Sequence, residues 1–225
     1  MNFEITGAPF PILNIQLKQG ESIICQKGGM AWMSQAMTMQ TSGGGLGKMF
    51  SKAISGESMF QNTYTASNGD GFIAVGSKVP GNILPIQLSD GNSIIAQKSA
   101  FLASETGVSF EMFFQKKLGA GFFGGEGFIM QKYKGNGMVF LEIDGSIIEY
   151  VLAPNETMKL DTGYLAAMES SVKIDIETVK GIGNALLGGE GFFNTVVTGP
   201  GKIWLQTMPT SVLASSIQPY IVTGS

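Results

Sequence analysis

The feature that most constrains this chain is a short phrase that its sequence repeats three times. The copies begin at Leu17, Leu88 and Leu152, and the first two share the letters Ser-Ile-Ile-x-Gln-Lys. A second phrase built on Gly-Glu follows, with its glutamate 40, 38 and 38 residues after the respective leucine. Two phrases in fixed order at nearly fixed spacing indicate a triplicated unit, and an internal repeat decides the architecture before local propensity does.

The repeated units read as strands. Val172, Ile174 and Ile176 alternate with charged residues, and similar short alternating stretches recur along the chain. Asn-Gly, Asp-Gly and Gly-Pro-Gly turns separate them, and glycine supplies the positive φ that tight turns need. Such a pattern is typical of a β-sandwich, barrel or jelly-roll-like fold. Little helix is expected; the best candidates, residues 46–54 and 183–187, are short and flanked by glycine.

No polar linker or change of composition divides the repeats. We therefore expect one compact domain, 1–225, built of three repeats with approximate limits 1–87, 88–151 and 152–225. Each unit is too small to bury its apolar face alone, so the three should share a core in a pseudo-threefold arrangement. Trp32 and Trp204 lie in strand patterns, and we expect both in that core.

The chain carries few charges. Charged residues make up 14% of the sequence and the net charge is −3, whereas a typical globular protein has about 25% charged residues. Such a surface favours homo-oligomerisation, with apolar surface buried between subunits. The alternative is that Ser, Thr, Asn and Gln cover the surface instead.

Missing residue types exclude several functions. The sequence contains no His and no Arg, so it lacks His-based catalytic triads, the commonest metal ligand and the bidentate fork for phosphate or guanine. Its 14 lysines face 17 acidic residues, which argues against a nucleic-acid partner. Cys25 is the only cysteine, so no intrachain disulfide can form, and we expect an inert core residue. No spacing of acids indicates a catalytic pair. We expect no enzyme activity, no metal and no cofactor.

No targeting pattern is visible. The sequence has no run of 18 apolar residues, and its first residues lack the basic and apolar regions of a signal peptide. A cytoplasmic location is the expectation that remains.

Glycine-rich segments precede the three Gly-Glu phrases, at residues 43–57, 116–126 and 180–190. Each combines glycines, lysine and bulky apolar residues. Repeat equivalence should bring them to one end of the molecule, as an apolar patch rimmed by lysine that meets a protein partner or a membrane surface. Alternatively, the apolar side chains plug the core or meet another subunit. The candidate interaction residues are Leu46, Met49, Phe50, Phe122, Phe123, Leu186 and Leu187.

Glu57, Glu126 and Glu190 form a trio related by the repeat. Three carboxylates around a pseudo-threefold axis would suit a hard cation. Alternatively, each accepts hydrogen bonds from the backbone of its own glycine turn, which costs less electrostatically because the charges stay apart. We expect this second, structural role. A phosphate-loop interpretation of the glycine-rich segments fails, because Met49 stands where Ser or Thr would bind magnesium.

The repeated phrases resemble a known family. Gly124-Gly-Glu-Gly-Phe128, the stretch from Gly137 to Leu152, and Gly163-Tyr-Leu-Ala-Ala167 are similar to uncharacterised bacterial proteins related to the mitochondrial "altered inheritance of mitochondria protein 24" family. The resemblance runs from about Phe3 to Leu213. The first copy departs from the pattern, with Ser55, Ser58 and an inserted Met59, so its loop geometry is expected to differ.

The resemblance implies a fold like the tryptophan RNA-binding attenuator protein, repeated within one chain, and a homotrimer. It supplies no catalytic residues, and the attenuator's RNA binding is not carried over because fold does not imply function. The mitochondrial relatives are linked to inner-membrane organisation, which favours the apolar-segment hypothesis. We therefore expect a non-enzymatic assembly or scaffold protein. The alternative is a small-ligand-binding β protein with a pocket between sheets or subunits.

Overall fold

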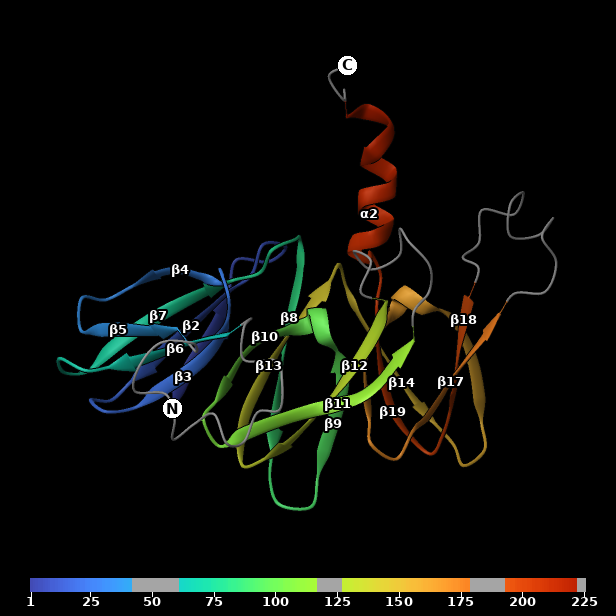
Figure 1. The fold of residues 1–225 in the computed structure, drawn as a ribbon, viewed down its shortest axis with the longest axis horizontal. Coiled ribbons are helices and arrows are strands. Elements are labelled where there is room, and N and C mark those ends of the chain that lie inside the picture. The colour runs from blue at the N-terminus through green and yellow to red at the C-terminus, as the bar shows by residue number, and fades with distance from the viewer. Residues whose placement is uncertain (42–60, 117–126, 179–192, 222–225) are drawn as a thin grey trace.

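The computed structural model describes residues 1–41, 61–116, 127–178 and 193–221. Within these residues the chain is almost entirely antiparallel strand, as the alternation predicted, with a single short α-helix, α2 (Thr210–Ile217). Figure 1 shows the first, middle and last thirds of the chain side by side in a row. The predicted all-β, sandwich-like fold is confirmed. None of the described helices is long and apolar enough to cross a bilayer.

The first third of the chain opens with an additional strand, β1 (Asn2–Thr6), which pairs with β2. The strands that follow in this third are β2 (Ile12–Leu17), β3 (Ser22–Gln26), β4 (Met30–Met33), β5 (Met37–Thr41), β6 (Gln61–Ala66) and β7 (Gly71–Gly76). We call β2 to β7 unit 1.

Units 2 and 3 have the same order of strands. Unit 2 contains β8 (Gly81–Leu88), β9 (Ser93–Gln97), β10 (Phe101–Glu105), β11 (Val108–Lys116), β12 (Phe128–Gly135) and β13 (Gly137–Asp144). Unit 3 contains β14 (Ile147–Leu152), β15 (Thr157–Asp161), β16 (Leu165–Glu169), β17 (Lys173–Thr178), β18 (Phe193–Thr198) and β19 (Gly201–Gln206). The sequence limits 87/88 and 151/152 fall within β8 and β14, so each of these strands begins before the limit.

The same strand pairings occur in each unit. The first strand pairs with the last, as in β2–β7, β8–β13 and β14–β19. The fourth strand pairs with the fifth, as in β5–β6, β11–β12 and β17–β18. A turn bond also recurs, in which a polar side chain accepts the backbone N–H three residues before it. It joins Lys18 to Glu21, Ser89 to Asn92 and Ala153 to Glu156, at 2.8, 2.8 and 2.7 Å.

The described strands form four sheets, and two of them combine strands from neighbouring units. One has the order β5-β6-β3-β10-β13-β8, and the other β11-β12-β9-β16-β19-β14. At the two ends of the row lie a four-stranded sheet, β1-β2-β7-β4, and a three-stranded sheet, β15-β18-β17. The pseudo-threefold order of the units stays a prediction.

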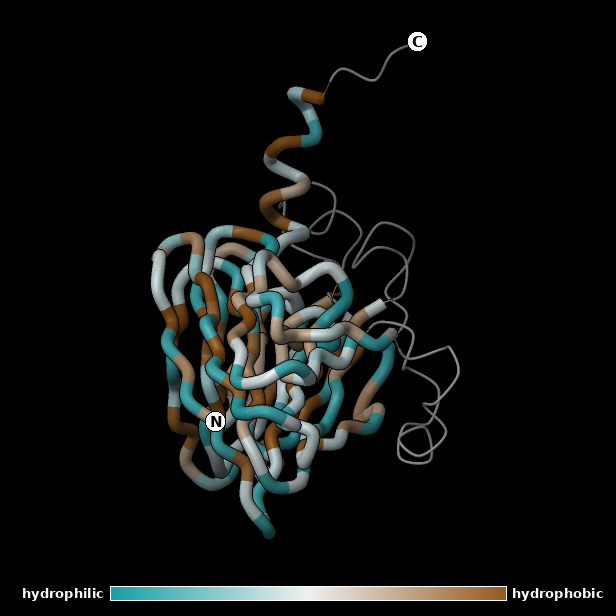
Figure 2. Tube along the Cα trace, turned by 90° about the vertical axis from the view of Figure 1, so that its left-hand side faces the viewer, coloured by the Kyte–Doolittle hydropathy of each residue, from teal (hydrophilic) through white to brown (hydrophobic). Residues whose placement is uncertain are grey.

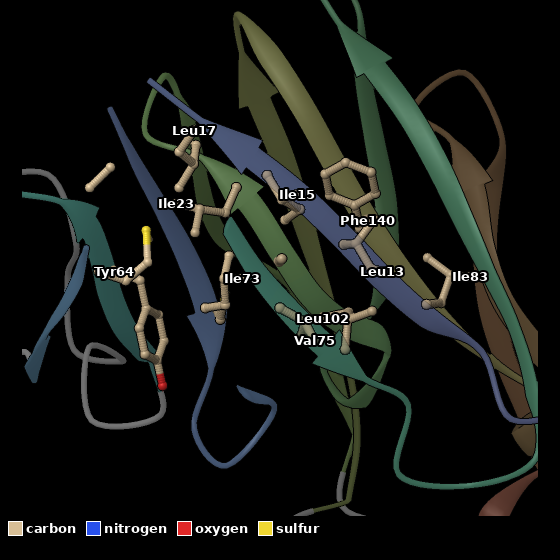
Figure 3. Packing of buried hydrophobic residues seen from close by; sticks show 14 residues of the cluster. Leu13, Ile15, Leu17, Ile23, Tyr64, Ile73, Val75, Ile83, Leu102 and Phe140 are labelled. Carbon is tan, nitrogen blue, oxygen red and sulfur yellow. The ribbon is translucent and has the colours of Figure 1, made fainter. Parts of the chain in front are cut away.

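Three clusters of buried apolar side chains form the core. The first joins the four-stranded sheet to the first six-stranded sheet, through residues such as Leu13 and Ile73 on one side and Ile23 and Phe140 on the other (Figure 3). The second cluster joins the two six-stranded sheets, and the third joins the last of these to the three-stranded sheet. Each cluster therefore lies between two sheets, which is the arrangement of a sandwich.

The predicted turns lie between strands. Asp90-Gly91 joins β8 to β9, and Asp144-Gly145 joins β13 to β14. Gly145 has φ +77°, and a Cβ there would lie 2.6 Å from Thr207 Oγ1. Both the backbone conformation and the close approach therefore require glycine.

Helix α2 was not expected from the sequence. It follows Pro209, and Figures 1 and 2 show it pointing away from the sheets. None of its residues is buried. Its first residue is held to β13 by the carboxylate of Asp144, which accepts hydrogen bonds from Thr210 N and Thr210 Oγ1 at 2.7 and 2.5 Å.

Candidate assembly interface

The predicted interaction residues lie outside the described residues. This holds for Leu46, Met49, Phe50, Phe122, Phe123, Leu186 and Leu187, for Glu57, Glu126 and Glu190, and for the two predicted helices. The strands that lead into two of the segments are described, and they meet. Lys116 Nζ, at the end of β11, donates a hydrogen bond of 2.8 Å to the carbonyl of Ile176 in β17. Gathering of all three segments at one end stays a prediction.

Neighbouring units are joined by one kind of strand pairing. The third strand of a unit pairs with the second strand of the unit before it, as β10 with β3 and β16 with β9. Among the described strands, β4 in the first unit and β15 in the last unit have no partner of this kind. Both strands therefore leave a row of backbone donors and acceptors at a sheet edge. We call them the β4 edge and the β15 edge.

The side chain of Trp32, on the β4 edge, is exposed where its equivalents are buried. Trp32 lies opposite Ala74 in β7, just as Ala103 lies opposite Phe140 and Ala167 opposite Trp204. Ala103 and Ala167 are 0% exposed, whereas Trp32 is 51% exposed. The prediction that Trp32 lies in the core of the chain is wrong, and the prediction for Trp204 is confirmed. The reason is that Trp32 occupies a junction strand with no neighbouring unit.

The same contrast occurs at the other end of the row. In β14, Ile148 and Tyr150 are 42% and 44% exposed. Their equivalents in β2, Leu13 and Ile15, are 0% exposed and belong to the first core cluster. The equivalence follows from pairing, because each pair of residues faces the same two positions of the last strand of its unit. The first six-stranded sheet covers these two positions of β2 in unit 1, and no described strand covers their equivalents in β14.

The junctions within the chain contain buried polar contacts as well as apolar ones. Gln26 Nε2, in β3, donates to Glu142 Oε2 of β13 at 3.0 Å. At the second junction Gln97, the equivalent of Gln26, donates to the carbonyls of Gly163 and Leu165 at 3.2 and 2.6 Å. Asp161 takes the equivalent place on the β15 edge, where it is exposed. No local pattern marks these residues, because glutamine and glutamate are ordinary surface residues in a strand pattern.

Burial raises the pKa of the Cys25 thiol above its ordinary range. The side chain is 0% exposed within the first core cluster. A thiol that keeps its proton is a poor nucleophile and a poor metal ligand. The prediction that Cys25 is a core residue is confirmed.

Metal-ligand clusters and cavities are the remaining features that could mark a site among the described residues. No three or more of their Cys, Asp or Glu side chains are grouped to hold a metal ion. An open cavity of about 480 Å³ lies beside the β8–β9 turn, lined by residues that include Asp90, Lys132 and Lys134. Lys134 is paired with Glu111 at 2.8 Å. The small-ligand alternative stays a prediction, which a thermal-shift screen against metabolites would test.

Comparison with known proteins places this fold in a family. The family model described as "Mitochondrial biogenesis AIM24" matches residues 3–208. An uncharacterised protein of Streptococcus pyogenes serotype M6 is 31% identical over 226 residues, which cover 96% of this chain and 89% of the relative. The crystal structure of a Streptococcus pyogenes protein superimposes with a TM-score of 0.79 at 27% identity, covering 98% of this chain and 99% of the other. The resemblance noted in the sequence is thereby confirmed, and the chain belongs to the AIM24 family.

Proposed function

We propose that this protein is a non-enzymatic assembly protein, which self-associates and presents its glycine-rich segments to a protein partner or a membrane surface. One observation carries the proposal: the strands that join units inside the chain are buried, and the equivalent strands at both ends of the row are open. A scaffold that continues its own internal junctions between copies would have this construction.

The energetics of the ends favour self-association. Trp32, Ile148 and Tyr150 leave large apolar areas in water, and full burial of one such side chain contributes about 1.5–3 kcal/mol. Few charges oppose the contact, since charged residues are 14% of the chain. Pairing of the β4 and β15 edges would also satisfy backbone groups that the isolated chain leaves to solvent.

Light scattering coupled to size-exclusion chromatography tests the self-association. The chain mass is 23.8 kDa, and we expect a single species at an integral multiple of it, with three copies as the resemblance implies. A monomer at all protein concentrations in the micromolar range would remove the proposal.

A second experiment tests the glycine-rich segments. Liposome co-sedimentation should recover the wild-type protein and lose the Phe122→Ser/Phe123→Ser variant, provided that light scattering shows the same assembly for both. Equal recovery of the two proteins would remove the membrane version. Pull-down with the same pair of proteins then decides whether these phenylalanines contact a protein partner.

A further inference from the structure

We propose that copies of this chain join head to tail, with β4 of one copy pairing antiparallel with β15 of the next. The inference rests on the proposed self-association and adds its partner surfaces and register. The four-stranded and three-stranded end sheets would merge into one sheet of order β1-β2-β7-β4-β15-β18-β17, in which β15 to β17 belong to the next copy. Each six-stranded sheet already has this construction, with half of its strands from each of two units.

The register follows from the two junctions inside the chain. There, Ala103 pairs with Cys25 and Ala167 with Ala96. Trp32 is the β4 residue that corresponds to these two alanines, as its position opposite Ala74 showed.

On the other strand, Leu160 corresponds to Cys25 and Ala96. All three lie opposite the same position of the fifth strand of their units, namely Thr195, Asn62 and Gln131. The junction between copies therefore pairs Trp32 with Leu160 of the next copy. By the same antiparallel register, Met33 pairs with Lys159 and Ser34 with Met158.

Side-chain packing supports the same register. Four positions meet in the first core cluster: two in the first strand, one in the second strand and one in the third strand of the following unit. They are Leu13, Ile15, Cys25 and Ala103. The second cluster uses the same four positions, filled by Leu84, Ile86, Ala96 and Ala167.

In unit 3 the first three of these positions are Ile148, Tyr150 and Leu160. Ile148 and Tyr150 are exposed, and Leu160 packs only partly buried against the third cluster. The fourth position is Trp32 of another copy. The indole would therefore cover the two exposed side chains, because directly opposed cross-strand neighbours lie on the same face of a sheet.

Lys159 is the polar exception in this row, since its equivalents are Ile24 and Ile95. Its ammonium group is already paired with Glu177 at 2.7 Å. The Lys159 charge that enters the contact between β4 and β15 is therefore already balanced by Glu177. The two edges differ in sequence, so the contact is heterologous and closes into a ring when the rotation between copies permits.

Cysteine cross-linking tests the pairing. We would prepare Met33→Cys and Lys159→Cys as separate proteins and oxidise them alone and after mixing under conditions that exchange subunits. Opposed residues in an antiparallel pair have Cβ atoms about 4.5–5.5 Å apart, which brings their thiols within reach of a disulfide. We expect covalent dimers in the mixture, none in either protein alone, and bands up to the full oligomer in the double variant. Cys25 can stay, because it is buried.

Two controls separate this inference from the proposed function. Thr157→Cys mixed with Met33→Cys should cross-link roughly tenfold more slowly, because diagonal Cβ atoms lie about 7–8 Å apart. A mixture of Trp32→Cys and Leu160→Cys tests the same register a second time, and we expect it to form covalent dimers. Cross-linking of Met33→Cys with itself, or an oligomer in which neither predicted pair reacts, would overturn head-to-tail pairing and leave self-association standing. A monomeric wild-type protein would overturn both.

Discussion

Gln26 and Glu142 are joined by a buried hydrogen bond of 3.0 Å, although they are 116 residues apart in the sequence. The carboxylate also accepts hydrogen bonds from Ser77 Oγ and Lys78 N, at 2.9 and 2.6 Å. Glu142 is 4% exposed. These three hydrogen bonds lie where units 1 and 2 meet, so one side chain links three segments of the chain.

Replacement of Glu142 by Leu should lower the free energy of unfolding by about 3 kcal/mol, because it leaves the buried Gln26 amide and two further donors without an acceptor. Glu142→Gln should cost less, since it keeps the shape and an acceptor oxygen, and Gln206 stands at the equivalent place in unit 3. Urea denaturation measures both. Glu4→Leu, at an exposed position of β1, is the matched control, expected within about 0.5 kcal/mol of wild type. Equal stability of all four proteins would contradict the structural role of Glu142.

Trp32→Ala should weaken self-association without unfolding the chain. Loss of the indole from a contact between copies reduces the free energy of association by about 1.5–3 kcal/mol. The dissociation constant should therefore rise roughly tenfold to hundredfold. Analytical ultracentrifugation measures the change, and circular dichroism checks the fold.

Val151→Ser is the control for that measurement. Val151 is 71% exposed, and its equivalents Gln16 and Gln87 are exposed as well, so the proposed junction leaves this position in water. Self-association of Val151→Ser should therefore match wild type. An equal loss in both variants would show a general effect of removing apolar surface rather than a contact at Trp32.

Asp144→Ala should loosen helix α2. Pro209 precedes the helix and offers no side-chain cap, so the carboxylate of Asp144 takes that role from β13. Loss of an N-terminal cap costs about 1 kcal/mol, and amide hydrogen exchange over residues 210–217 should accelerate about fivefold. Thr210→Val, which removes only the hydroxyl donor, should have a smaller effect. Unchanged exchange in Asp144→Ala would show that the helix is held by other contacts.

The same carboxylate should leave a signature in the pH dependence of stability. Burial is the largest influence on the Asp144 carboxyl, and it raises the pKa above the ordinary value of 3.8 in spite of the Thr210 hydrogen bonds. The folded state then binds this proton more readily than the unfolded state. The contribution of Asp144 is therefore largest below the unfolded pKa and is lost as pH rises through the folded pKa. Wild type should lose stability relative to Asp144→Asn over that window, and parallel curves would contradict the shift.

Because the Cys25 thiol is buried, we expect the protein to lose stability at alkaline pH. Its buried thiol keeps its proton in the folded state, whereas the unfolded thiol ionises near pH 8.5. Each pH unit above that value should therefore cost about 1.4 kcal/mol. Cys25→Ala removes this contribution, and Ala96 shows that alanine fits the equivalent place. Denaturation curves from pH 8 to 10 measure the difference between the two proteins, and equal slopes would contradict it.

Local pattern predicted much of the fold. Ile174 and Ile176 alternate with charged residues and lie in β17, and Asp144-Gly145 forms the turn between β13 and β14. These predictions succeeded because strand alternation and turn chemistry depend on residues close together in the chain. Helix α2 escaped prediction because eight residues without a charged stripe give no periodic signal.

The candidate interface depended on contacts that no local pattern contains. Trp32 and Trp204 sit in similar alternating stretches, yet Trp204 is 8% exposed and Trp32 is 51% exposed. Their difference arises from position in the row of units, which is a property of strand pairing across about 70 residues. Gln26 and Glu142 were overlooked for the same reason, since their burial follows from the pairing of distant strands.

The sequence by itself determined the all-strand class, the order of strands and turns, and the absence of histidine and arginine chemistry. These follow from side-chain periodicity, glycine conformations and composition, which are properties of neighbouring residues or of a count. The tertiary structure alone decided which strand of one unit pairs with which strand of the next, and thus that β4 and β15 have no junction partner among the described strands. Local sequence does not contain this information, because a sheet edge is open or covered only in relation to strands that lie elsewhere in the chain.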